Sequence, residues 1–166
     1  GAYTIADEFV QTFFNIYDAE RHQIMNFYGS QSVFTMSSYY DDVKNAQIDN
    51  IYMRVQRYAK SSRNISKVSN MNQFSANVFI GTEAIGRVLN ELPKTSHHQL
   101  SFCIDVPFYE PMNRVIISVS GTFEDHGVML NETNFLVAFT RTFVLVPSEN
   151  NQYFIANEQL SIHSPT

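Results

Sequence analysis

Three carboxylates lie where an acid could take part in general acid–base catalysis, namely Asp18, Asp105 and Glu158. Tyr17 and Tyr28 are hydroxyl donors that could assist them. A carboxyl in a dry apolar cavity has a raised pKa, and a His–Asp pair fixes a base, so either can move protons near neutral pH. However, Asp18 is better explained as a helix cap, Asp105 and Glu158 could pair across a sheet or an interface, and no spacing connects them to a histidine. An enzyme is therefore the weaker hypothesis.

Histidines at positions 97, 98 and 126 raise the question of a metal site. Adjacent histidines in a strand point to opposite faces, no H-x-x-x-H pattern occurs, and Cys103 is the single cysteine. We expect these histidines in loops and Cys103 as a small buried hydrophobic residue. No glycine-rich phosphate loop or nucleophile elbow is present in the sequence. The sequence predicts neither a metal nor a cofactor.

Basic residues are concentrated between positions 44 and 67, which hold six of the 11 lysines and arginines. The four that we single out are Arg54, Arg57, Lys60 and Lys67. Such a patch can hold RNA phosphates with strong salt dependence. We treat it as a candidate for a weak auxiliary RNA contact. The alternative is a solvated helix and loop, partly offset by Asp41 and Asp42.

The composition is that of one domain that is poor in charged residues and rich in aromatic residues. The 166 residues fit a single domain, and the net charge of −5 argues against a surface coated in phosphate-binding residues. Charged residues make up 16% of the chain, against about 25% in typical soluble domains. With 14 Phe and 9 Tyr, we expect another chain to cover part of the apolar surface. An aromatic-rich core is the alternative. No apolar run approaches the length of about 18 residues that spans a membrane.

Hydrophobic periodicity predicts helices first and strands last. The predicted helices cover residues 4–17, 51–58 and 83–90, with a shorter helix between Asp18 and Gly29. The predicted strands cover residues 32–37, 102–106, 114–123, 135–146 and 153–162. This order is typical of an α+β, cone-shaped domain, with N-terminal helices packed on one face of a curved, mostly antiparallel sheet.

Two long blocks give the sequence a family resemblance. Leu89-Asn-Glu-Leu-Pro-Lys-Thr95 and Ala138-Phe-Thr-Arg-Thr-Phe143 resemble the nuclear-transport-factor-2-like (NTF2-like) domain of the nuclear RNA export factors, the Tap family. Shorter matches in the same order extend the resemblance from about Phe9 to Ser161, and they are Ile16–Asp18, Ser62–Asn64 and Ile155–Glu158. The resemblance implies a non-catalytic cone-shaped domain that spans residues 1–166 and belongs to a longer, multidomain export receptor.

The resemblance also implies partners and a place in the cell. In this family the domain forms a heterodimer with a small subunit of the same fold, and the two sheets face one another. The receptor carries mRNA through nuclear pores by binding Phe-Gly repeats of nucleoporins. We therefore expect a protein that shuttles between the nucleus, the nuclear pore and the cytoplasm, with no membrane partner.

The resemblance assigns two charged residues to the heterodimer interface. In relatives, the arginine of the Ser-Arg-Asn block forms a salt bridge with an acidic residue of the small subunit, and here it is Arg63. The aspartate that ends the Ser-Phe-x-x-Asp strand faces an arginine of that subunit, and here it is Asp105. A bidentate arginine–carboxylate pair would fix the register of the two chains. An intrachain pair or simple surface exposure is the alternative.

Alternation along strand 135–146 completes the expected interface. Phe139, Arg141 and Phe143 share one face of this strand. Because Arg141 is hard to bury against the helices without a partner, we expect this face to point outward. Aromatic residues and arginine are enriched at interfaces. The alternative outward set is Thr140, Thr142 and Val144.

In the family, the Phe-Gly site is a shallow apolar pocket between the first helix and the loop before the last strand. The matching positions are Val10, Pro147 and Tyr153, and Phe14, one helical turn from Val10, would add a wall. The sequence departs from the animal pattern at Asp7 and at Tyr153, so the pocket could be shallower or shifted. An ordinary helix–turn contact is the alternative. The alternative functions are a cone-fold enzyme acting on a small hydrophobic substrate and an RNA-binding surface at residues 44–67.

Overall fold

The computed structural model describes residues 1–38, 57–64, 75–127, 131, 133–150 and 152–163. The first elements are α1 (Ala2–Ala19), the 3-10 helix η1 (Arg21–Phe27), β1 (Tyr28–Ser38), β2 (Phe79–Ile80) and α4 (Thr82–Glu91). The elements that follow are β3 (Thr95–His97), the 3-10 turn η4 (Gln99–Ser101), β4 (Cys103–Glu110), β5 (Arg114–Asp125), β6 (Phe135–Pro147) and β7 (Tyr153–Ile162). The helix expected at 51–58 lies outside the described residues except for its last two positions, which are helical.

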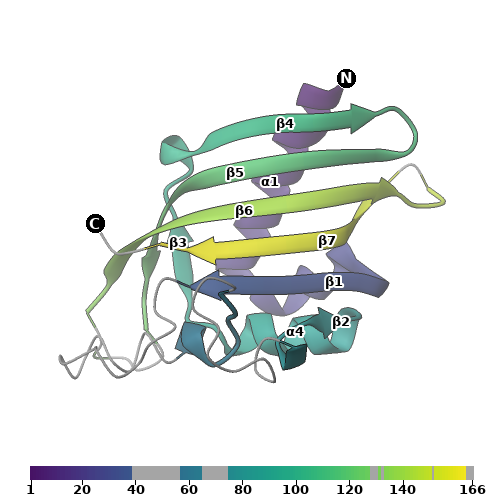
Figure 1. The fold of residues 1–166 in the computed structure, drawn as a ribbon. Coiled ribbons are helices and arrows are strands. Elements are labelled where there is room, and N and C mark those ends of the chain that lie inside the picture. Colours follow the sequence, from purple (N-terminus) through teal and green to yellow (C-terminus); the bar gives the residue numbers. More distant parts are fainter. Residues whose placement is uncertain (39–56, 65–74, 128–130, 132, 151, 164–166) are drawn as a thin grey trace.

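The seven strands form one curved sheet, in the order β2-β1-β7-β6-β5-β3, with β4 also paired to β5. Neighbouring strands run antiparallel except β1 and β7, which are parallel. Figure 1 shows α1 crossing behind the sheet, while the face toward the viewer carries none of the labelled helices. Among the described residues, helices thus cover one face of the sheet and leave the other open, and the α+β prediction is confirmed.

The core lies between α1 and the helix-covered face of the sheet. The apolar stripe of α1 buries Phe9, Phe13 and Tyr17. The rings of Phe9 and Phe13 meet the ring of Phe143 on β6 at centroid distances of 5.0 and 4.9 Å. Edge-to-face pairs of this kind add stability beyond the burial of their area. The apolar stripe predicted from the helical periodicity thus packs α1 against the helix-covered face of the sheet.

The tertiary structure differs from the predicted elements at several places. Strand β3 contains His97, which we expected in a loop, and β2 was not predicted. Cys103 is exposed rather than buried, because it opens β4, which pairs only with β5. Short segments such as β2 and β3 carry too few residues to display a period. Within the described part of the chain, no helix combines the length and apolar character needed to cross a membrane.

Candidate functional site

The face of β6 that carries Phe139, Arg141 and Phe143 points into the core, so the prediction that it forms an outward interface is wrong. The exposed fractions of these residues are 1%, 1% and 0%. Their burial follows from the register, since the same row of β5 presents Ile117 and Val119 to α1. Phe139 and Phe143, which we expected at the surface, instead lie in the core.

Arg141 is buried because Glu158 accompanies it on the next strand. The Arg141 Nε donates to Glu158 Oε2 at 3.0 Å, and the Tyr28 hydroxyl donates to Glu158 Oε1 at 2.7 Å. Glu158 is 0% exposed. Burial alone would favour a neutral guanidine, but the Glu158 carboxylate outweighs it and the pKa of Arg141 lies above its ordinary value. Burial, followed by the Glu158 charge, raises the pKa of Tyr28 well above 10.0.

A second polar pair, Asp18 with His97, joins the end of α1 to β3. Asp18 Oδ1 accepts hydrogen bonds from Thr95 Oγ1 and from His97 Nδ1, both at 2.7 Å, and its Oδ2 accepts from the His97 backbone N–H at 2.7 Å. Asp18 is therefore not the cap of η1, as the sequence suggested, and it does contact a histidine. The residue before η1 is Glu20, which makes no side-chain capping bond.

The ionisation of this pair follows from its burial. Burial would raise the pKa of Asp18, but the hydrogen bonds and charge of His97 outweigh it, so the pKa is lowered from 3.8. Burial lowers the pKa of His97 from 6.5 to about 4, against the opposing effect of Asp18. At neutral pH, His97 is thus an uncharged ring whose Nδ1–H donates to an ionised carboxylate, and the contact is a hydrogen bond rather than an ion pair.

The surroundings of His97 determine what this pair can do. The His97 side chain is 1% exposed. The rings of Phe14, Phe123 and Phe139 lie 4.7, 4.9 and 5.2 Å from it. A His–Asp pair is the arrangement expected of a cone-fold enzyme, but here aromatic side chains occupy the space where a substrate would meet the imidazole. The described residues therefore favour a structural role for the pair.

An apolar hollow of about 640 Å³ opens on the surface between α1, η1 and the start of β7. Its walls on α1 are Ile5, Glu8, Phe9, Thr12 and Ile16. Its other walls are Gln23, Asn26 and Phe27 of η1, with Gln152 and Tyr153 at the start of β7. Phe9 and Phe27 meet edge to face, with ring centroids 5.8 Å apart. The floor is thus aromatic, and amide and carboxylate groups line the rim.

This hollow lies where the Phe-Gly pocket was expected, but its walls differ from those predicted. Tyr153 lines it, and Pro147 pairs with Tyr153 in the register of β6 and β7. The prediction that Val10 and Phe14 form walls is wrong, because they are 2% and 0% exposed and pack in the core. The helical period already grouped Ile5, Phe9 and Ile16 as apolar. It could not show which side of the stripe reaches the surface.

The open face of the sheet is built of short polar side chains in rows across the strands. One row runs from Cys103 on β4 through Ser120, Thr140 and Ser161 to Ser37 on β1. The next runs from Asp105 through Ser118, Thr142 and Gln159 to Thr35. A third runs from Phe108 through Ile116, Val144 and Asn157 to Val33. The face is therefore polar in its first two rows and mostly apolar in the third.

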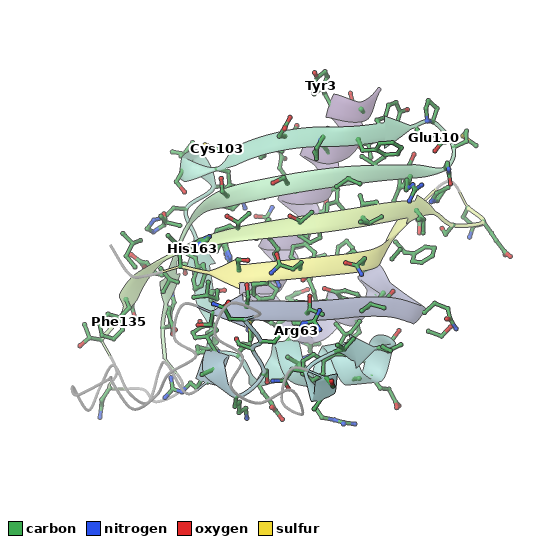
Figure 2. The ribbon with its side chains drawn as sticks, viewed as in Figure 1. Tyr3, Arg63, Cys103, Glu110, Phe135 and His163 are labelled. Atoms are coloured by element: carbon green, nitrogen blue, oxygen red, sulfur yellow. The ribbon has the colours of Figure 1, made fainter. Side chains whose placement is uncertain are left out.

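Asp105 and Arg63 lie at opposite sides of the open face. Asp105 is exposed on β4, and its Oδ1 accepts a bond from the Val106 backbone N–H at 2.9 Å. The half-buried Arg63 donates its backbone N–H to the Met36 carbonyl of β1 at 2.8 Å. Figure 2 labels Arg63 beside β1, across the sheet from Cys103 on β4. Strands β5, β6 and β7 thus lie between Asp105 on β4 and Arg63 beside β1.

The basic stretch is described only in part. Arg57 is half-buried, and the exposed Lys60 Nζ lies 3.3 Å from Glu91 Oε2. Arg54 and Lys67 lie outside the described residues. No group of three or more His, Cys, Asp or Glu side chains gathers as a metal site within the described ranges.

Comparison with known proteins identifies relatives along the whole chain. The family model described as nuclear RNA export factor, NTF2 domain, matches residues 5–163. Nuclear RNA export factor 2 of Drosophila melanogaster is 29% identical over 184 residues, covering 100% of this chain and 22% of the relative. The mRNA export factor MEX67 of Saccharomyces cerevisiae is 29% identical over 194 residues, covering 95% of this chain and 31% of the relative. The chain thus spans about a fifth to a third of these relatives.

A solved structure shares the fold. A chain of the Candida albicans complex of Mtr2 with the Mex67 M domain superimposes with a TM-score of 0.80 at 24% identity, covering 100% of this chain and 97% of that chain. The NTF2-like fold expected from the sequence is confirmed.

Proposed function

This chain belongs to the NTF2-domain family of nuclear RNA export factors, and from that premise we propose that it is a non-catalytic binding domain of an mRNA export receptor. It forms a heterodimer with a small subunit of the same fold through the open face of its sheet. It also binds Phe-Gly repeats of nucleoporins, as part of a longer receptor that shuttles between nucleus, pore and cytoplasm.

The single observation that carries the proposal is the open sheet face. A sheet buries one face against its own helices, and a broad second face is commonly covered by another element or chain. Here the rows through Cys103, Asp105 and Phe108 each cross five strands. The face also combines hydrogen-bonding hydroxyls with an apolar end, which is the mixture found at protein interfaces.

Asp105 and Arg63 supply the charges of this contact. A carboxylate exposed beside hydroxyls is solvated in the free chain and can pair with an arginine of the partner. Asp105 on β4 and Arg63 beside β1 would each meet a charge of the opposite sign, so the pair would fix how the two sheets are aligned. Phe139, Arg141 and Phe143 are buried in the core, so they do not contribute to the proposed interface.

The test is the solution mass of this chain, alone and with the small subunit from the same cell, measured by sedimentation. We expect a 1:1 heterodimer, weakened about tenfold or more by Arg63→Glu combined with Asp105→Arg. Glu20→Lys, exposed at the end of α1, is the control and should leave the affinity within about twofold. A chain that stays monomeric in the presence of the small subunit would refute the proposal. A double variant that binds the subunit with unchanged affinity would refute the two charge assignments.

The hollow beside α1 is the proposed Phe-Gly site. Its floor of Phe9 and Phe27 can take one aromatic side chain, and its rim amides can bond the backbone of a short peptide. One buried Phe side chain stabilises a complex by about 1.5–3 kcal/mol, so a single repeat binds weakly. Weak binding suits transit, because many repeats act together and exchange rapidly.

A further inference from the structure

The turn between β4 and β5 holds a methionine in a backbone conformation that favours glycine. Residues 110–113 form this turn, which the Asn113 N–H closes by donating to the Glu110 carbonyl at 3.0 Å. Met112 has a φ of 63° and is the one described non-glycine residue with positive φ. Pro111 precedes it, so the sequence of conformations is that of a type II turn, whose third position normally carries glycine or asparagine.

Packing against the described residues does not account for the placement of this side chain. Met112 is 78% exposed. A left-handed conformation costs free energy for a residue with a Cβ, and strain of this kind is often retained where a side chain has a function. Asparagine is tolerated in that conformation, and it stands at the very next position, Asn113. Asparagine at position 112 would relieve the strain and would remove the apolar side chain.

The turn lies just beyond the apolar end of the open face. Phe108 lies four residues before Met112, is 40% exposed, and stands on the open face in the row of Ile116 and Val144. The Arg114 guanidinium lies 5.3 Å from the centre of the Phe108 ring, and Arg114 pairs with Glu110 across the turn. Figure 2 labels Glu110 at the end of this hairpin. The turn therefore lies at the same end of the sheet as the third row.

We propose that Met112 is an apolar anchor for the small subunit of the same fold, extending the sheet contact past the end of β4 and β5. The inference rests on the proposed heterodimer and assigns to it a residue of this chain. The polar rows set alignment, and Phe108 with Met112 provides the apolar contact at one end. A flexible thioether fits this role because methionine adapts to irregular apolar surfaces.

The experiment uses the heterodimer purified as such, diluted stepwise, with dissociation followed by sedimentation. Met112→Asn suits the left-handed turn better than methionine but removes the apolar side chain, so loss of affinity cannot come from a broken turn. We expect its dissociation constant to rise about tenfold, and Met112→Gly to behave alike. Met112→Leu keeps the apolar bulk and should stay within about threefold of the unsubstituted chain.

Tyr3→Ser is the matched control, since Tyr3 is 84% exposed on α1, at the helix-bearing face. It should leave dissociation unchanged. A heterodimer that tolerates Met112→Asn within about twofold overturns this inference and leaves the proposed function standing. A chain that forms no heterodimer overturns both. If Met112→Asn dissolves a homodimer of this chain instead, the occupant is a second copy and the inference is wrong.

Discussion

The Arg141 guanidinium meets the Glu158 carboxylate at 3.0 Å between β6 and β7, with exposed side-chain fractions of 1% and 0%. The pair lies on the helix-bearing side of the sheet, under α1. The Tyr17 ring on α1 lies between two cations, with Arg141 4.5 Å and Arg21 3.8 Å from its centre. A charge network thus holds the first helix to the last two strands, in the interior of an aromatic core.

Removing one member of this pair should destabilise the fold strongly. Glu158→Leu leaves the guanidinium buried without its counter-charge, so we expect the free energy of unfolding to fall by about 3–5 kcal/mol. Urea denaturation measures it. Arg141→Met added to Glu158→Leu should recover most of the loss, because two apolar side chains carry no unpaired charge. A single variant that loses less than about 1 kcal/mol would contradict a buried ion pair.

Stability should fall on mild acidification because of His97. Its pKa is about 4 in the folded chain and 6.5 when unperturbed, so between these values the unfolded chain binds a proton that the folded chain does not. Stability therefore rises with pH across this window, and about 3 kcal/mol is lost on going from pH 7 to pH 4. Denaturation of the chain and of His97→Gln at several pH values measures the difference.

The ionisation of Asp18 affects the stability of the fold in a separate pH range. Because the pKa of Asp18 is lowered below 3.8, its contribution to stability is present above that value and is lost as the pH falls through the folded pKa. His97→Gln should flatten the slope between pH 6.5 and 4. It should also weaken the slope below pH 3.8, because the His97 side chain is a main cause of the lowered pKa of Asp18. An unchanged slope in this variant would show that other groups cause it.

Filling the hollow should abolish Phe-Gly binding without unfolding the chain. Thr12 is exposed on α1 and lines the hollow, so the indole of Thr12→Trp would occupy it. We expect the affinity for a Phe-Gly peptide to fall about tenfold or more, measured by peptide titration of the heterodimer. Gln11→Trp adds the same side chain one position away, outside the hollow, and should have little effect. Equal binding by both variants would place the peptide elsewhere.

A methyl group at Gly121 should destabilise the sheet. A Cβ there would lie 2.6 Å from Phe102 Cδ1 and 3.0 Å from Ser101 Oγ. The Phe102 ring contacts Phe14 and Phe139, so it has little room to move. We expect Gly121→Ala to reduce the free energy of unfolding by about 1–3 kcal/mol. Ser120→Ala, on the open face of the same strand, is the control, and equal stability of the two variants would contradict the close packing.

The sequence alone predicted the elements that carry a clear period. The strand expected at 153–162 is β7 with the same bounds, and β6 extends the expected 135–146 by one residue. α1 was predicted from its apolar stripe, although it begins two residues before the expected Thr4. The first block that carries the family resemblance runs from the end of α4 to the first residue of β3, and the second lies in β6. These are local patterns, which a sequence displays directly.

Which face of each element is covered was decided by the tertiary structure. Alternation showed that Phe139, Arg141 and Phe143 share a face, and the same alternation fits an outward or an inward row. The row turns inward because the register of β6 and β7 brings Glu158 to Arg141, 17 residues apart in the chain. Asp18 and His97 meet across 79 residues in the same way. The free energy of a buried charge depends on the residue that pairs with it in the folded chain. When that residue is distant in the sequence, hydrophobic periodicity does not reveal the pairing.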